Sequence, residues 1–212
     1  MASTQPEGYL AVPTTGERKP ILVLHAWWGL NETIKTFCDH LAEHGFTAFA
    51  PDLYHGKVTD TIEGAEALSS AIDDKKAFAD IAWAIKFVKD RSSLPEGGIA
   101  VIGFSFGAYF SLAISNSTPD EIHSVIVFYG TGPDDFNKSK ARYLGHFAEE
   151  DKYEPKEYVD GLEESLQSAG LPVTFYRYPG TGHWFFEPDR TDAFDKAAAD
   201  LAWERTLAFL KE

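Results

Sequence analysis

Short apolar runs rich in β-branched and aromatic residues alternate along this chain with longer segments whose apolar residues recur at helical spacing. Parallel strands are joined by crossover helices that cover the sheet, so the alternation predicts a mostly parallel central sheet with helices on both faces. Strands are expected at residues 21–25, 47–50, 99–103, 124–129, 141–147 and 173–178, with a short edge strand at 9–12.

Helical periodicity is clearest between the first two of these strands. Ile34, Phe37 and Leu41 share one face of the predicted helix. Asn31 precedes that helix as a candidate N-cap, and Gly45 follows its end. Similar spacing predicts further helices over residues 81–88, 105–116, 155–169 and 194–209.

The length of the chain favours one domain. Its 212 residues, 44% of them hydrophobic, can bury a single layered core. No internal repeat and no linker rich in Pro, Gly or Ser divides the sequence. We therefore predict one domain over residues 1–212.

Charge and targeting signals narrow the expected partners. The formal net charge of -14 disfavours nucleic acid and anionic membrane surfaces, because both need clustered Lys and Arg, so a small-molecule partner is expected. The N-terminus lacks a signal-peptide pattern, and no apolar run approaches the length of a membrane span. The lone cysteine, Cys38, excludes an internal disulfide. These features predict a cytoplasmic protein, and a monomer or small homo-oligomer is expected.

One motif carries a specific chemistry. Residues 103–107, GFSFG, match the G-x-S-x-G pattern, in which small flanking residues let the chain turn sharply and lift the serine hydroxyl above the sheet. The motif follows a predicted strand and precedes a predicted helix, as this chemistry requires. A plain turn between strand and helix is the alternative, but the context favours Ser105 as a nucleophile.

A serine nucleophile needs an imidazole to accept its proton and a carboxylate to orient that imidazole, in the chain order Ser, acid, His. His183 lies after the last predicted strand in the glycine-rich segment GTGHW and is the candidate base. His146 is the competing histidine. It ends an apolar strand, so a core position is expected for it instead.

The acid is expected in the segment AEED at residues 148–151, directly after a predicted strand. Asp151 is the preferred residue, with Glu150 and Glu149 as alternatives, because spacing alone does not separate the three. If none of the three carboxylates is catalytic, the segment is a solvated acidic turn.

Acyl transfer also needs hydrogen-bond donors for the developing oxyanion. The backbone N–H groups of Phe106, after the nucleophile, and of Trp27, in the loop after an early strand, are the candidates. Trp28 could replace Trp27, because position rather than side chain defines this role.

Other polar residues near the predicted strand ends have simpler interpretations. His25 and Asp52 are expected to organise loops through hydrogen bonds, and His55 is either a turn residue or part of a pocket. The sequence shows neither a ligand cluster with metal spacing nor a glycine-rich phosphate loop, so no metal and no cofactor are expected.

The chain resembles the dienelactone hydrolase family over nearly its whole length. This resemblance implies an α/β-hydrolase fold without a large lid, no cofactor, and hydrolysis of small esters or lactones. In that family the acid stands where Asp151 stands. The matching stretches are GYLAVP at 8–13, ILVLHAWWGLN at 21–31, GFTAFAPDLYHG at 45–56, VIGFSFGA at 101–108, YLGHFAEEDKYEP at 143–155 and YPGTGHWF at 178–185.

This sequence departs from the family pattern at two places. Many members use a cysteine nucleophile, and the archetypal enzymes pair it with a glutamate where this chain has Ala26; here Ser105 takes the nucleophile position. The archetypal enzymes also hold a substrate carboxylate with arginines, one of them four residues after the catalytic histidine. Glu187 occupies that place, and no arginine lies between His55 and Arg91.

A neutral ester, lactone or acyl group is therefore a more plausible substrate than dienelactone itself. Aromatic side chains are expected to line the pocket. They are Trp27, Trp28, Tyr54, Phe106, Trp184 and Phe185.

The leading hypothesis is a hydrolase that cleaves small carboxylic esters or lactones through Ser105, His183 and Asp151. A thioesterase or acyl transferase with the same triad is one alternative. A binding or sensing module that kept the fold without turnover is another. The complete set of Ser, acid and His argues against it, because folding alone does not demand all three residues.

Overall fold

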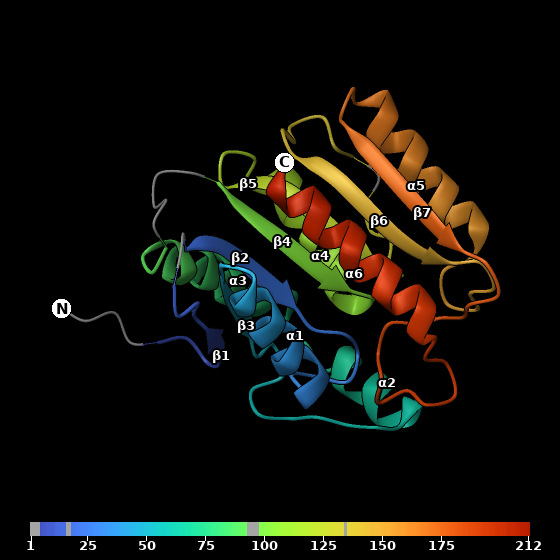
Figure 1. Cartoon of the computed structure of the whole chain (residues 1–212), viewed down its shortest axis with the longest axis horizontal. Coiled ribbons are helices and arrows are strands. Elements are labelled where there is room, and N and C mark those ends of the chain that lie inside the picture. Colours follow the sequence, from blue (N-terminus) through green and yellow to red (C-terminus); the bar gives the residue numbers. More distant parts are fainter. Residues whose placement is uncertain (1–4, 16–17, 93–97, 134) are drawn as a thin grey trace. The chain divides into compact units, whose positions relative to one another are not determined.

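The computed structural model describes residues 5–15, 18–92, 98–133 and 135–212 (Figure 1). The chain divides into two compact units, Met1–Val101 and Ile102–Glu212. In the described ranges it forms seven strands, β1 to β7, and six helices, α1 to α6.

The strands of the first unit are hydrogen-bonded in the order β1-β3-β2. β1 pairs with β3 antiparallel, and β2 pairs with β3 parallel. α1 packs against β1 and β3, whereas α3 packs against β2 and β3. The elements of this unit are β1 (Gly8–Ala11), β2 (Lys19–Leu24), α1 (Glu32–Glu43), β3 (Phe46–Pro51), α2 (Ile62–Ser70) and α3 (Asp74–Lys89).

α1 forms where the sequence predicts it. The Asn31 side chain accepts a hydrogen bond from the N–H of Ile34 at 3.2 Å, which satisfies one of the free donors at the helix start. Gly45 just beyond the helix has a φ of 92°, a left-handed conformation that glycine adopts without strain. The predicted N-cap and the predicted end of the helix are both confirmed.

The second unit is built on parallel strands in the order β4-β5-β6-β7, with β4 entering it from residue 102. β5 to β7 pair in parallel. In Figure 1, α6 lies in front of these strands and α4 lies behind them, in contact with β5. The elements are β4 (Ile99–Phe104), α4 (Phe106–Ser117), β5 (Ile122–Phe128), β6 (Arg142–Ala148), α5 (Lys156–Ser168), β7 (Val173–Tyr178) and α6 (Lys196–Lys211).

Burial of both faces explains why β5 and β6 carry mostly apolar side chains. Val125 to Phe128 are at most 1% exposed. His146 is a core residue of β6, as predicted: Tyr178 Oη lies 2.7 Å from its Nδ1, and Thr206 Oγ1 lies 3.0 Å from its Nε2. Burial lowers the pKa of His146 to about 3, so this imidazole stays neutral.

Each predicted strand and helix is present. The ends differ from the prediction by at most two residues, except that α3 begins at Asp74, seven residues before the predicted start at 81. α2 was not predicted. Its apolar face is short, made of Ile62, Ala65 and Leu68, and Ala65 is its one buried residue. In the described ranges no connection between elements is long enough to form a large lid, as predicted. No helix among the described residues has the length and apolar character needed to span a bilayer.

Candidate active site

Ser105 occupies a strained turn between β4 and α4. Its φ is 47° and its ψ is −109°, a backbone conformation that residues other than glycine rarely adopt. Two backbone bonds hold the turn: the Ser105 N–H donates to the Phe128 carbonyl at 2.9 Å, and the Ala108 N–H donates to the Ser105 carbonyl at 2.8 Å. The turn leaves the Ser105 side chain half-buried at the start of α4.

Two glycines let the chain pass close to this turn. A Cβ on Gly103 would lie 2.5 Å from the Gly107 carbonyl oxygen and 2.7 Å from Ala108 Cα, distances that backbone atoms do not allow. A Cβ on Gly130, two residues beyond β5, would lie 2.6 Å from the Ser105 carbonyl oxygen. The motif predicted the first glycine, but nothing in the sequence singled out Gly130.

His183 lies in the loop after β7 and reaches the serine. Its Nε2 is 2.9 Å from Ser105 Oγ, and its Nδ1 is 2.7 Å from Asp151 Oδ2. The side chains of His183 and Asp151 are only 4% and 3% exposed. With the ring neutral, the Nδ1–H donates to the carboxylate and Nε2 accepts from the serine hydroxyl. The structure therefore brings the three predicted residues together in one hydrogen-bonded chain.

The backbone of the loop after β6 fixes the orientation of Asp151. Asp151 Oδ1 accepts from the N–H groups of Tyr153 at 2.8 Å and Glu154 at 3.0 Å, which leaves Oδ2 for the imidazole. Glu149 instead accepts from the Gly180 N–H through its side chain at 2.8 Å. The exposed Glu150 ties the two loops through its own N–H, which donates to the Thr181 carbonyl. Of the three candidate acids, Asp151 is the one that lies against His183.

Three aromatic rings surround the imidazole of His183. The ring centroid of Tyr129 lies 4.9 Å away, that of Tyr153 5.0 Å and that of Trp184 5.0 Å. Tyr129 is fully buried, whereas Tyr153 is 41% exposed and covers the imidazole toward solvent. The ring of His183 is therefore packed on several sides, which restricts its rotation.

A buried acid stands behind this aromatic cluster. Glu187 is inaccessible to solvent, and its Oε1 accepts a hydrogen bond from the Tyr129 hydroxyl at 2.7 Å. Its Oε2 has no hydrogen-bond partner among the described residues. Burial raises the pKa of Glu187 to about 8, and the charge of Asp189 acts in the same direction. The acid is therefore mostly neutral at pH 7.

Several residues of this site have strained backbone conformations. Among the described residues, four other than glycine have a positive φ, and three of them are Ser105, Tyr129 and Trp184. Conformations of this kind persist where the surrounding structure holds them, and they cluster at functional sites.

Comparison with known proteins assigns the chain to a family. Residues 7–212 match the model of the dienelactone hydrolase family. The chain belongs to the dienelactone hydrolase family.

Individual relatives agree with this assignment. Protein usf of Aquifex pyrophilus is 31% identical over 214 residues, which cover 97% of this chain and 92% of that protein. A crystal structure from Klebsiella pneumoniae, described provisionally as a dienelactone hydrolase, has a TM-score of 0.86 at 21% identity and covers 97% of this chain and 92% of that one. A promiscuous dienelactone hydrolase-like phosphotriesterase from metagenomic libraries has a TM-score of 0.81 at 18% identity, with 93% and 87% covered. The two structures confirm the predicted α/β-hydrolase fold.

The residues predicted to line a pocket lie in both units of this dienelactone hydrolase family member. Trp184 and Phe185 follow His183 in the second unit and are 8% and 0% exposed. Trp27 and Trp28 lie in the loop after β2 in the first unit, the former half-buried and the latter buried. Their contact with a substrate stays a prediction.

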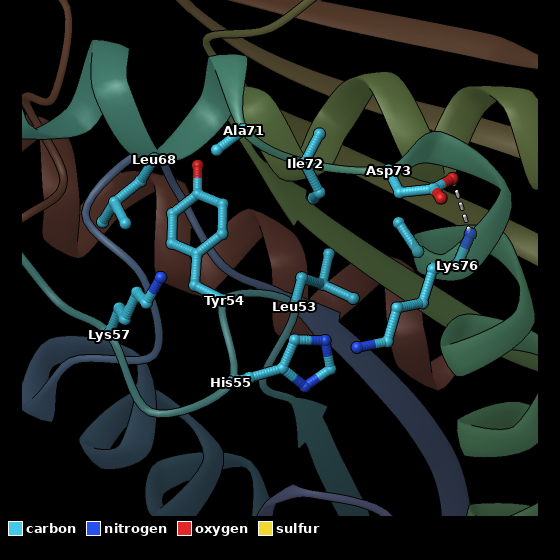
Figure 2. A pocket seen from close by; sticks show the side chains of 10 residues that line it. Leu53, Tyr54, His55, Lys57, Leu68, Ala71, Ile72, Asp73 and Lys76 are labelled. Atoms are coloured by element: carbon cyan, nitrogen blue, oxygen red, sulfur yellow. Dashed lines mark hydrogen bonds between the residues drawn. The ribbon is translucent and has the colours of Figure 1, made fainter.

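Tyr54 lines a separate cavity within the first unit. Its volume is about 170 Å³, and Figure 2 shows Leu68 and Ile72 beside Tyr54, with Lys57 and Lys76 on opposite sides of it in this view. Both lysines are exposed to solvent. This cavity holds no pair of nucleophile and base, so Ser105 and His183 remain the candidate centre of the family's chemistry.

Two polar residues of the first unit organise loops, as predicted. The buried His25 donates through Nδ1 to the Ala26 carbonyl at 2.8 Å and accepts at Nε2 from the Leu53 N–H at 3.2 Å. Asp52 accepts from the N–H groups of Tyr54 and Gly56.

His55 is both a turn residue, with a φ of 52°, and part of the cavity wall. In the described part of the chain, no group of three or more His, Cys, Asp or Glu side chains is arranged to hold a metal ion.

The variant Glu187→Gln is expected to remove a pH dependence of stability. Because the pKa of Glu187 is raised from 4.5 to about 8, the folded protein keeps a proton that the unfolded chain releases. The free energy of unfolding of the wild type should therefore fall as the pH rises through this interval, by up to about 1.4 kcal/mol per pH unit, and the variant should lack this contribution. Denaturant titrations across the interval measure the difference.

The exposed Glu157, also in the second unit, provides the control for this experiment. The variant Glu157→Gln should keep the slope of the wild type, because that carboxyl is solvated in both states. Parallel curves for the wild type and the Glu187→Gln variant would contradict the prediction.

Proposed function

We propose that this member of the dienelactone hydrolase family hydrolyses small neutral carboxylic esters or lactones, with Ser105 as nucleophile, His183 as base and Asp151 as acid. The observation that carries the proposal is the continuous chain of hydrogen bonds, 2.9 Å from Ser105 Oγ to His183 Nε2 and 2.7 Å from His183 Nδ1 to Asp151 Oδ2. Nucleophile, base and orienting acid lie within the distances that this chemistry needs.

The reaction proceeds in two halves. His183 Nε2 takes the hydroxyl proton as Ser105 Oγ attacks the carbonyl carbon, and the resulting imidazolium gives that proton to the leaving alcohol oxygen as the ester bond breaks. Water then attacks the acyl-enzyme with His183 again as base, and the carboxylic acid and the free serine are released. Asp151 stays ionised and stabilises the imidazolium in both halves.

Backbone N–H groups stabilise the oxyanion in this proposal. Phe106 is the first residue of α4, where the N–H groups have no intrahelical acceptor and the helix dipole favours negative charge. Each such donor contributes roughly a hundredfold or more to the rate.

The charge around the site supports a neutral substrate. Glu187 stands where archetypal family members have an arginine for the substrate carboxylate, and it is buried and hydrogen-bonded to Tyr129. An acid in this place offers no positive charge to an anionic substrate. Trp184 and Phe185, which follow His183 in the second unit, remain the proposed aromatic pocket residues.

The domain organisation and the cellular compartment are also part of the proposal. The match to one family model over residues 7–212 supports a single domain. The buried, unpaired Cys38 supports a reducing compartment such as the cytoplasm. We propose a monomer or small homo-oligomer that acts on a small-molecule substrate without a cofactor.

A chromogenic acetate ester tests the proposal. The wild type should release a burst of chromophore equivalent to one acyl group per chain, followed by slower steady turnover. Mass spectrometry of an acid-quenched sample should locate the acetyl group on the peptide that contains Ser105. Absence of the burst, of the label and of any steady turnover would reject the hydrolase and favour a binding or sensing module. Acceleration by added alcohol or thiol acceptors would identify an acyl transferase.

A further inference from the structure

Tyr129 joins the two halves of the proposed site. It directly follows β5, whose last residue, Phe128, accepts the Ser105 N–H at 2.9 Å. The next residue, Gly130, passes so close to Ser105 that a Cβ there would lie 3.0 Å from Ser105 Cα. The strand end that supports the nucleophile therefore also carries the Tyr129 ring.

The Tyr129 ring supports the imidazole from its buried side. Its centroid lies 4.9 Å from that of His183, with an angle of 58° between the ring planes, and the residue is inaccessible to solvent. Its φ of 35° is unfavourable for an aromatic residue. The Tyr129 ring also packs against Phe185, with 5.5 Å between the ring centroids.

The hydroxyl of Tyr129 is fixed by the loop that carries the base. It donates to Glu187 Oε1 at 2.7 Å, and Glu187 follows His183 by four residues. The Glu187 N–H in turn donates to the Trp184 carbonyl at 2.9 Å, which closes the loop on itself. One side-chain hydrogen bond thus connects the end of β5 to the histidine loop, with the His183 ring packed beside it.

We propose that Tyr129 and Glu187 are positioning residues that hold His183 within hydrogen-bonding reach of Ser105. The inference rests on the proposed role of His183 as the base. Both residues act through the imidazole: Tyr129 through ring contact, and Glu187 by fixing the Tyr129 hydroxyl. Loss of their hydrogen bond lets the histidine loop shift, and small displacements of a base from its nucleophile are costly in rate.

The protonation state of Glu187 determines which substitution preserves its hydrogen bond to Tyr129. Tyr129, Asp189 and Arg190 are the titratable or charged groups that act on Glu187. Burial, with a smaller contribution from Asp189, outweighs the lowering by Tyr129 and Arg190 and raises the pKa of Glu187 to about 8. Because Oε1 accepts the tyrosine hydroxyl, the acid proton belongs to Oε2. Glutamine imitates this neutral acid, and its amide oxygen can still accept the Tyr129 hydroxyl.

The kinetic test compares three changes of this pair. In Tyr129→Phe and Glu187→Leu, the kcat for a chromogenic acetate ester should fall roughly 10-fold or more with little change in KM. Glu187→Gln should retain most of the wild-type kcat at pH 7, because it keeps the hydrogen bond. Equal losses in Glu187→Gln and Glu187→Leu would contradict the role given to this bond.

Tyr143→Phe is the matched control for Tyr129→Phe. Tyr143 is equally buried, and its hydroxyl also makes side-chain hydrogen bonds, to Ser115 at 2.7 Å and Ser139 at 2.6 Å. The control should lower stability by a similar amount and leave kcat unchanged. If Tyr143→Phe lost as much kcat as Tyr129→Phe, general destabilisation would explain both losses and the inference would be overturned.

Proton NMR tests the positioning without any turnover. The His183 Nδ1–H, held by Asp151, should give a downfield resonance in the wild type, in Glu187→Gln and in Tyr143→Phe. This resonance should broaden or disappear in Tyr129→Phe and Glu187→Leu, whose histidine loop is released. An unchanged line in Tyr129→Phe would overturn the inference. A wild type that shows the resonance but hydrolyses no ester would instead reject the proposed function, and the NMR comparison of the variants would still decide the positioning.

Discussion

Replacement of Ser105 by alanine should lower kcat for a chromogenic ester by about 10⁶-fold, close to complete loss. The variant keeps the pocket and the oxyanion donors but has no atom that can form the acyl-enzyme. The burst should vanish as well, because it measures acylation of this one hydroxyl. Stopped-flow and steady-state measurements on the two proteins check both expectations.

Ser111 provides the control for this variant. It lies six residues after Ser105, within α4, and its hydroxyl donates to the Gly107 carbonyl at 2.9 Å. Ser111→Ala should therefore retain the burst and a kcat near that of the wild type. More than about 1% residual kcat in Ser105→Ala, after exclusion of contaminating esterase, would mean that the ester is cleaved by another route.

Much of the fold could be predicted from the sequence because hydrophobic period and burial coincide. Central parallel strands are buried on both faces, so β5 contains the continuous apolar run VIVF and β6 is mostly apolar with His146 as a buried exception. α1 has both a clear apolar stripe and a side-chain cap. α2 is capped by Thr61, but its apolar face is limited to Ile62, Ala65 and Leu68 and buries Ala65 alone, so the sequence signal for this helix is weak.

The candidate site was predictable only in part. Ser105 and His183 stand in glycine-rich segments at strand ends, where parallel strands bring loops to one edge. The choice among Glu149, Glu150 and Asp151 depends on which carboxylate the local turn directs at the imidazole. That direction comes from two backbone N–H groups after Asp151, and spacing does not encode it.

The Tyr129–Glu187 pair shows what a single sequence conceals. The two residues are 58 positions apart, and their interaction depends on the crossover that brings the end of β5 against the histidine loop. The sequence marked Glu187 only as a substitution for an expected arginine. The sequence does not show that Glu187 is buried. In the structure it is a mostly neutral acid that accepts the Tyr129 hydroxyl, and it is not a charge on the surface.

The variant Asp151→Asn should lower kcat by about 10⁴-fold while the fold is retained. In the wild type Oδ1 accepts two backbone N–H groups and Oδ2 accepts the His183 Nδ1–H. The amide oxygen of asparagine should take the place of Oδ1, because the backbone donors need an acceptor. Its amide N–H₂ then faces Nδ1 and forces the ring proton onto Nε2, where the imidazole can no longer accept the proton of Ser105.

Glu150→Gln is the matched control, because Glu150 is the neighbouring carboxylate, is exposed, and was the nearest alternative acid in the sequence. Its kcat should stay within about twofold of the wild type, since its link to the histidine loop runs through its backbone N–H and survives the change. The kcat of both variants should be measured from pH 6 to about pH 10, because hydroxide or an external base can substitute for the misprotonated imidazole only at the alkaline end. A large loss in Glu150→Gln with a small one in Asp151→Asn would transfer the role of the acid to Glu150. Similar small losses in both would show that His183 needs no carboxylate to reach its reactive tautomer.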